Sequence, residues 1–365
     1  VVNATYPAPV SISTVGFRWL VTVAATQAVA RMFNSTDKHR DRACPSWNSS
    51  SNCNNIFAML PDGRRTGSLL SDHRGSGAAG RSFADGFDHA GTVTSYASSL
   101  GNVEGAEWKL PVMYLYRRQL ADSAGAGEYR GGVTCEVALT PYGVDELTLK
   151  LTNTAGTEQT NAHGIDGGYP GAGSQSFMVR NADIDAHLTQ SARLLKQTDL
   201  RGDLTWLPSK ADEVIRKGDI YGFWAAGGGG FRDPLRRVPA KVAEDVRSGL
   251  VSTAEARRSY GVVLDDDGSA DEDATQALRD QRRAEKRVNG RKHAAVPGPA
   301  CTACGATGGV VQSRYPLCHA GPWIARRYNG DGPNFELQET SCSACGALVD
   351  VSEVLKKTAE TGATQ

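Results

Sequence analysis

Two short cysteine motifs near the C-terminus constrain the fold of this chain more than any other sequence feature. They are Cys301-Thr-Ala-Cys304-Gly and Cys342-Ser-Ala-Cys345-Gly. The two-residue gap lets both sulfurs of a motif reach one metal ion, and the glycine permits a tight turn that aims backbone N–H groups at the sulfurs. Four thiolates in a closed tetrahedron are typical of structural zinc, so we predict a structural rather than a catalytic metal site.

Other interpretations of the cysteines are less favoured. The simplest is two reduced dithiols. A redox pair is the other, but thioredoxin-like chemistry uses one such motif at a strand-to-helix junction. Cys318 and His319, between the two motifs, could replace one ligand, but four better-spaced thiolates exist. Cys44, Cys53 and Cys135 are scattered, and without a signal peptide this distribution predicts a reducing, cytoplasmic location.

The composition indicates a globular chain and argues against two classes of partner. The 365 residues are enough for two domains, and 40% of them are hydrophobic. Nucleic-acid binders carry a basic excess, but 40 basic and 40 acidic side chains cancel here. The longest apolar stretch, Val15 to Phe33, contains two arginines, which predicts no membrane span but a helix buried on several sides.

Local patterns predict an α+β fold, with a β-rich core domain, flanking helices, long loops and a small zinc-ribbon-like domain. Strand-like runs cover 111–116, 132–137 and 146–151, and residues 34–110 are polar and aperiodic, as expected for long ordered loops. Pro239, Ser252 and an arginine-rich stretch ending near Val288 indicate three helices.

We predict four segments from these patterns: a first domain at 1–289, a linker at 290–300, the zinc-ribbon-like domain at 301–355 and a flexible tail at 356–365. The linker contains two prolines. A linker of this kind predicts that the two domains unfold independently.

The polar loops hold the candidate binding residues. The pairs Asp72-His73 and Asp88-His89 each place a carboxylate beside an imidazole, which can orient a base or a metal ligand. Adjacent side chains seldom face each other, so loop polarity without function is the alternative. We predict a substrate pocket within residues 72–98 and assign no catalytic residue.

Three further motifs are weak. Gly75-Ser-Gly-Ala-Ala-Gly80 has the letters of a dinucleotide fingerprint, but no strand precedes it and no clear helix follows. The run 227–230 lacks the Lys-Ser/Thr of a P-loop and predicts a close crossing of backbones or the wall of a substrate passage. Asp265-Asp-Asp-Gly268 has its glycine too early for a calcium loop and predicts a solvated turn.

Three motifs, in order, resemble the hydantoinase B/oxoprolinase family. Asp122-Ser-Ala-Gly-Ala-Gly-Glu-Tyr-Arg-Gly-Gly132 is similar to its DSGGAGKYRGG signature, and 227–234 is similar to its GGGGYGDP. Residues 244–263 resemble the family's usual ending. The resemblance spans Val1 to Arg287 and corresponds to the C-terminal half of a member. The HHxDxGG metal motif of the N-terminal half is not found, so the resemblance implies that another chain supplies that half.

The resemblance looks closer to the acetone and acetophenone carboxylase branch. Residues 110–118 resemble that branch, and 339–351 is similar to the end of its small zinc subunit, the gamma subunit of acetone carboxylase. It implies a subunit, inactive alone, of a multi-subunit ligase that joins an activated enol to activated bicarbonate. ATP and a second divalent metal are then expected in partner subunits, among them a hydantoinase A-like one.

Two alternatives remain open at this point. The chain could serve an ATP-dependent cyclic-amide hydrolase of the hydantoinase, oxoprolinase or lactamase type, or it could be a zinc-ribbon scaffold without catalysis. One departure limits the transfer of residue roles: where many relatives read HTHMTNT, this chain reads His89-Ala-Gly-Thr-Val-Thr-Ser95.

Overall fold

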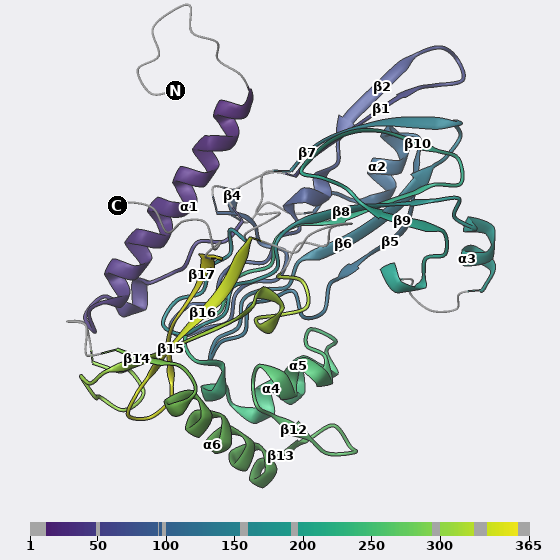
Figure 1. The fold of residues 1–365 in the computed structure, drawn as a ribbon. Helices are drawn as coiled ribbons and strands as arrows, with labels where there is room; N and C mark the ends of the chain where they lie inside the picture. Colours follow the sequence, from purple (N-terminus) through teal and green to yellow (C-terminus); the bar gives the residue numbers. More distant parts are fainter. Residues whose placement is uncertain are drawn as a thin grey trace, which may run out of the picture.

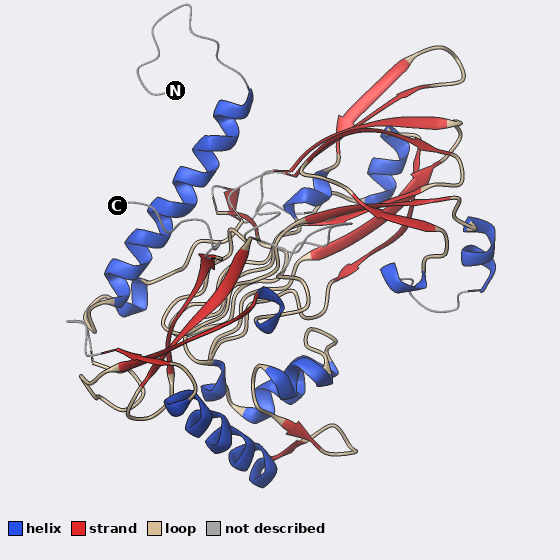
Figure 2. Cartoon of the chain, viewed as in Figure 1, coloured by secondary structure: helices blue, strands red, loops and turns tan. Residues whose placement is uncertain are grey.

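Two antiparallel sheets, a bundle of glycine-rich segments and a C-terminal sheet build the molecule (Figures 1 and 2). The computed structural model describes residues 12–48, 52–93, 95–96, 100–153, 160–190, 196–293, 300–324 and 334–356. Helices and strands are both abundant, which confirms the predicted α+β class. No described helix combines the length and the apolar character that a transmembrane segment requires.

The first two sheets face each other across one apolar core. The order of the first is β10 (Lys210–Arg216), β7 (Glu146–Asn153), β1 (Asn52–Met59) and β2 (Arg65–Leu69). The second runs β5 (Val112–Gln119), β6 (Cys135–Pro141), β11 (Ile220–Trp224), β8 (Gln175–Arg180) and β9 (Asp203–Trp206). Buried side chains from both sheets, such as Ile56, Leu149 and Phe223, share the core. Strands β5, β6 and β7 confirm the three predicted strand runs.

The hairpin of β1 and β2 lies where the sequence predicted long loops. Its inward face carries Asn54 and Ile56, both fully buried. The Tyr221 hydroxyl donates to Asn54 Oδ1 at 3.0 Å, so a polar side chain is accommodated on the core face. The alternation of apolar and polar residues that identifies a strand is therefore hidden in this segment.

Five extended segments, which we call the glycine bundle, run side by side between the pair of facing sheets and the C-terminal sheet: 75–80, 84–89, 123–133, 162–172 and 225–231 (Figure 2). They exchange backbone hydrogen bonds although most of their residues lie outside regular strands, for example from Gly132 N to Ala78 O at 2.8 Å and from Gly228 N to Gly132 O at 2.9 Å. A Cβ atom at Gly228 would lie 1.8 Å from Ala78 O. The predicted close backbone crossing at 227–230 is thus confirmed, and residues 75–80 open no α-helix.

Three helices flank the bundle as the sequence predicted. They are α4 (Pro239–Arg247), α5 (Thr253–Arg258) and α6 (Glu272–Val288). Ser252 Oγ accepts from Glu255 N at 3.1 Å, which is the N-terminal half of the expected capping box. Two shorter helices are α2 (Val103–Lys109) and α3 (Ile184–Gln190). Two small antiparallel sheets pair strands of two residues each: β3 (Gly91–Thr92) with β4 (Ser95–Tyr96), and β12 (Val263–Leu264) with β13 (Ala270–Asp271).

The predicted N-terminal helix is present as α1 (Ile12–Asn34), but only one stripe of its described side chains is buried. Val23, Gln27 and Ala30 face the protein, and Gln27 donates to Gly164 O of the bundle at 3.1 Å. Val21 and Met32 are 51% and 71% exposed. From Val21 to Asn34, where its side chains are described, the helix is therefore buried within this chain on one side only.

The C-terminal sheet orders its strands β14 (Arg291–His293), β15 (Val310–Pro316), β16 (Phe335–Cys342) and β17 (Leu348–Leu355). Strand β14 occupies part of the predicted linker. One hydrophobic core joins this sheet to the α4–α5 region, with Val242 and Tyr260 packed in the same cluster as Leu337 and Leu348. This shared core argues against independent unfolding of the two parts, and the domain boundaries stay a prediction.

A buried carboxylate fastens the C-terminal sheet to the bundle. Glu339 on β16 is 1% exposed and accepts from the Tyr169 hydroxyl and from Lys286 Nζ. His319 Nε2 lies 3.0 Å from the same carboxylate. Burial alone would raise the pKa of Glu339, but the bonds from His319, Lys286 and Tyr169 outweigh it and lower the pKa from 4.5 to about 2.

We expect the variant Gly228→Ala to lose about 2–3 kcal/mol of unfolding free energy, because the methyl group would overlap a neighbouring backbone that cannot move away. The control is Gly105→Ala, since the nearest atom to an added Cβ there is 4.0 Å away and its helix, α2, contains no buried residue. Urea denaturation of both variants measures the difference. Equal midpoints would contradict the close crossing.

The variant Glu339→Gln tests the buried carboxylate. A lowered folded pKa contributes stability that is fully present above about pH 4.5 and is lost as the pH falls toward 2, on the order of 3 kcal/mol for this shift. The difference in unfolding free energy between the wild type and Glu339→Gln should therefore shrink as the pH falls from 6 to 3. Glu336→Gln, on the same strand but paired at the surface with Arg314, is the control. A pH-independent difference would refute the assignment.

Candidate functional site

The two cysteine knuckles adopt the same local structure. Gly305 and Gly346 have φ values of 73° and 75°, which glycine adopts without strain. Their amides donate to Cys301 O and Cys342 O, both at 2.8 Å. In each knuckle the backbone N–H groups of the second and third residues after the first cysteine point at its sulfur, as the sequence predicted.

The sulfur geometry fits a tetrahedral metal site. The Sγ atoms of Cys301, Cys304, Cys342 and Cys345 all lie within 4.8 Å of one another. The pairs Cys301–Cys345 and Cys304–Cys342 are each 3.8 Å apart. A regular tetrahedron with Zn–S bonds of about 2.3 Å has edges of about 3.8 Å, so these two pairs already have the spacing that zinc requires. Cys318 is outside this cluster, and His319 is used by Glu339.

The knuckles contact the glycine bundle directly. Thr302 contacts one bundle residue and one residue that follows the bundle: its hydroxyl is 3.4 Å from Asp166 Oδ1, and its carbonyl accepts from Arg236 Nη1 at 3.3 Å. Behind the second knuckle, Leu348 N donates to Asp233 Oδ2 at 3.2 Å. A metal held by the cysteines would thus stabilise the loops that carry the glycine motifs.

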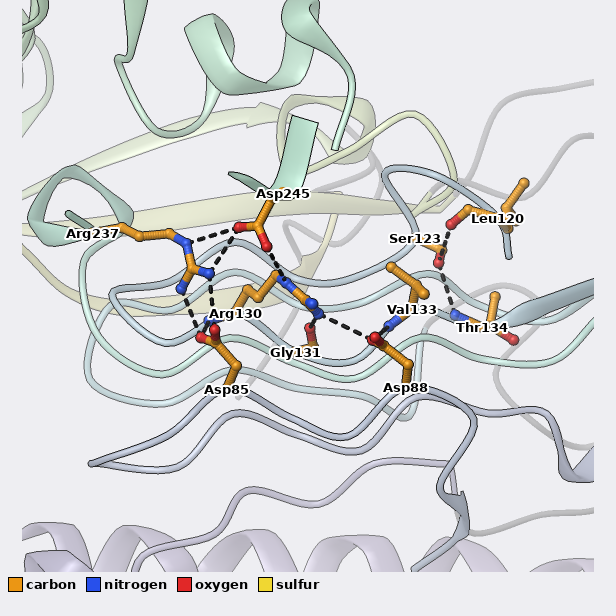
Figure 3. Close-up of polar contacts among 10 residues, drawn as sticks. All are labelled: Asp85, Asp88, Leu120, Ser123, Arg130, Gly131, Val133, Thr134, Arg237 and Asp245. Carbon is orange, nitrogen blue, oxygen red and sulfur yellow. Dashed lines mark hydrogen bonds and ion pairs between the residues drawn. The ribbon is translucent and has the colours of Figure 1, made fainter. Parts of the chain in front are cut away.

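A network of five charged side chains, three of them buried, crosses the bundle (Figure 3). Asp245 of α4 accepts from Arg130 Nε and from Arg237 Nε, both at 3.0 Å. Arg237, 2% exposed, also holds Asp85 through two nitrogens at 2.6 and 2.9 Å. Arg130 reaches Asp88 at 3.1 Å. Burial would raise the pKa of Asp85, but Arg237 and Arg130 outweigh it and keep that pKa below the usual value.

This network positions loops rather than offering a reactive group. Every carboxylate in it is bonded to a guanidinium, and Asp88 Oδ1 also accepts from Val133 N at 2.8 Å. Ser123 of the glycine motif is equally closed: it is fully buried, donates to Leu120 O at 2.6 Å and accepts from Thr134 N at 2.9 Å (Figure 3). Neither Ser123 nor the network is free to act as a nucleophile or base.

The four predicted binding residues have different surroundings. Asp88 belongs to the charged network. The side chain of His89 forms a hydrogen bond with the backbone of Gly75, and His89 itself has a strained φ of 54°. Burial lowers the pKa of His89, so its imidazole is neutral near pH 7. The side chain of His73 lies outside the part of the chain whose side chains are described. Asp72 is 3% exposed and lines a hollow.

That hollow, of about 260 Å³, lies between the turn at Ser71–Arg74 and α2. Asp72 accepts there from the Tyr114 hydroxyl at 2.7 Å and from Arg117 Nη1 at 3.2 Å. Burial and the Asp72 charge raise the pKa of Tyr114, so its hydroxyl stays a donor. A bulge between Tyr114 and Tyr116 on β5 shifts the pleat by one residue.

Sequence reasoning did not find Tyr114, Arg117, Asp245 or Arg237. The sequence offered one signal for the two arginines, namely their position next to a glycine motif. Arg130 is inside the 122–132 motif, and Arg237 follows 227–234. No sequence signal shows that a bulge brings Tyr114 and Arg117 to one face.

Comparisons with known proteins agree with this architecture. The hydantoinase B/oxoprolinase family profile matches residues 1–234. The acetone carboxylase alpha subunit of Xanthobacter autotrophicus is 29% identical over 233 residues, which is 58% of this chain and 29% of that protein. The caprolactamase subunit beta of Pseudomonas jessenii is 32% identical over 56% of this chain and 32% of its own length. The acetophenone carboxylase delta subunit of Aromatoleum aromaticum is 25% identical over 59% of this chain and 33% of its own length.

Solved structures show the same fold. Nucleotide-free acetone carboxylase superposes with a TM-score of 0.60 at 24% identity over 67% of this chain and 34% of that one. The ATP-dependent caprolactamase of Pseudomonas jessenii gives 0.53 at 24% identity, over 67% of this chain and 39% of that one. The chain spans about a third of the length of the curated relatives it matches. With the family profile covering more than half of it, this chain belongs to the hydantoinase B/oxoprolinase family.

Proposed function

We propose that this chain is one subunit of a multi-subunit, ATP-dependent ketone carboxylase. The observation that carries the proposal is its likeness, in sequence, to subunits of acetone and acetophenone carboxylases. In such a reaction ATP would activate the ketone as an enol phosphate and bicarbonate as carboxyphosphate. Water would take the phosphoryl group from the enol phosphate, releasing one phosphate and an enolate. The enolate carbon would then attack the carboxyl carbon of carboxyphosphate, forming the C–C bond as the second phosphate leaves.

The family resemblance supports placing ATP use in a partner. The printed sequence contains no P-loop motif, and the resemblance assigns ATP and a second divalent metal to a hydantoinase A-like subunit and to a chain carrying the N-terminal half. We propose that the substrate binds at the loops of residues 72–98, because Asp72 lines the hollow beside α2. A cytoplasmic location is part of the same proposal.

A cyclic-amide hydrolase is the second candidate, and a specific observation favours it. The caprolactamase subunit beta is as similar to this chain as the carboxylase subunits are. The same phosphoryl activation would serve a lactam carbonyl, with water in place of the enol carbon. The cysteine knuckles favour the carboxylase, because their segment resembles the small zinc subunit of that branch. A scaffold without catalysis is the third possibility.

In this proposal the four cysteines hold one structural zinc ion. The ion would have four thiolate ligands and no open position, so it would supply rigidity to the knuckles rather than a reactive water. Thr302 and Leu348 would transmit that rigidity to the bundle.

Elemental analysis of the purified protein should find one zinc per chain. Cys304→Ser should lose the metal and lower the thermal midpoint of the whole chain, since the C-terminal sheet shares its core with the α4–α5 region. Cys318→Ser is the matched control, an exposed cysteine outside the cluster that should keep both metal and midpoint. Freshly purified protein without zinc would exclude this metal site.

Coexpression with a hydantoinase A-like subunit and the chain of the missing half should yield a complex whose ATP hydrolysis requires both a ketone and bicarbonate. The isolated chain should hydrolyse no ATP and dissolve poorly. Measuring phosphate release with acetone, acetophenone, a hydantoin and caprolactam distinguishes the carboxylase from the cyclic-amide hydrolase. Stimulation by a cyclic amide without bicarbonate would select the hydrolase, and an active single chain would rule out the partner requirement.

A further inference from the structure

Arg117 is fixed in place by contacts at one of its nitrogens. Its Nη1 donates to Gly101 O at 2.6 Å and to Asp72 Oδ1 at 3.2 Å. Asp72 is in turn held by the Tyr114 hydroxyl. The guanidinium position is therefore set before any ligand arrives, which reduces the entropy that binding would cost.

The β5 bulge explains why these residues meet. In a regular strand Tyr114 and Arg117, three residues apart, would point to opposite faces. The register shift between Tyr114 and Tyr116 turns Arg117 to the face of Tyr114. Arg118 then faces the other way and donates through Nε to Glu136 at 2.8 Å. Bulges often re-aim side chains beside functional sites.

The contacts of Arg117 leave its Nε–Nη2 edge open. Among the residues whose side chains are described, neither of these nitrogens has a hydrogen-bond partner, and the side chain is 24% exposed. This edge presents two parallel N–H groups, the arrangement that matches two oxygens of a planar anion. Asp72 occupies only the Nη1 position, so it does not use the bidentate edge.

The hollow beside Arg117 suits a small anion. Its lining contains two cationic side chains, Arg117 and Lys109, against one carboxylate, Asp72. Leu69, Leu70 and Leu110 provide apolar walls. A volume of about 260 Å³ accommodates a ligand of a few heavy atoms.

We infer that this hollow is a binding site for a small planar carboxylate-type anion, with the Nε–Nη2 edge of Arg117 as its fork. The inference concerns binding by this chain's own residues. It stands whether or not the ATP-dependent reaction proposed above is correct.

Acetate is a suitable probe, because its methyl protons report millimolar binding by saturation-transfer NMR with the purified complex. Wild-type protein should give a saturable acetate signal, while an equal concentration of chloride, which lacks paired oxygens, should not displace it. Arg117→Lys keeps the charge but removes the fork, so acetate should bind about tenfold more weakly.

Arg118→Lys is the matched control, one residue along the same strand and likewise paired to a carboxylate. It should bind acetate as the wild type does, and thermal unfolding would verify that both variants are folded. Equal loss of acetate in the two variants, unchanged binding in Arg117→Lys, or no acetate signal in the wild type would each overturn the inference.

Discussion

The close approach of backbones in the glycine bundle is the constraint on which the rest of the structure depends. At Gly131, Gly227 and Gly228 an added Cβ would lie less than 2.0 Å from a carbonyl oxygen of another segment. Only glycine permits backbones to approach so closely. The close approach lets each segment donate and accept backbone hydrogen bonds without forming a pleated sheet. Glycine is also the residue with most conformational freedom to lose on folding, so the bundle needs external support.

Buried charge supplies part of this support. Asp245 belongs to α4, whereas Arg130 belongs to the bundle, so their ion pair fixes one element to the other. Arg237 adds Asp85 from a second bundle segment. Unpaired charges at such depth would be very costly, and the mutual pairing therefore permits only a narrow set of loop positions. Charge pairing specifies where the loops lie, while the apolar cores supply most of the stability.

The sequence predicted features that depend on local chemistry. Spacing and the following glycines located both cysteine knuckles, and Ser252 with Glu255 located the start of a helix, because each signal is contained in a few consecutive residues. The sequence did not predict the surroundings of a residue where a partner far along the chain determines them. Asn54 is buried in β1 because Tyr221 bonds it, and Asp72 faces Arg117 because a bulge on β5 turns that arginine. Neither partner is visible from the neighbouring residues.

The sequence also did not reveal that the two predicted domains share a hydrophobic core. Prolines and a change of composition mark a possible hinge in the chain, but they do not report what each side packs against. Here Leu337 and Leu348 of the C-terminal sheet enter the same core as Val242 and Tyr260, and Glu339 accepts from Tyr169 of the bundle. A metal bound at the knuckles would therefore not act on a separate domain. The hairpin of β16 and β17, which carries Cys342 and Cys345, also buries apolar surface of the α4–α5 region. The free energy of metal binding would in this way be coupled to the loops of the glycine bundle.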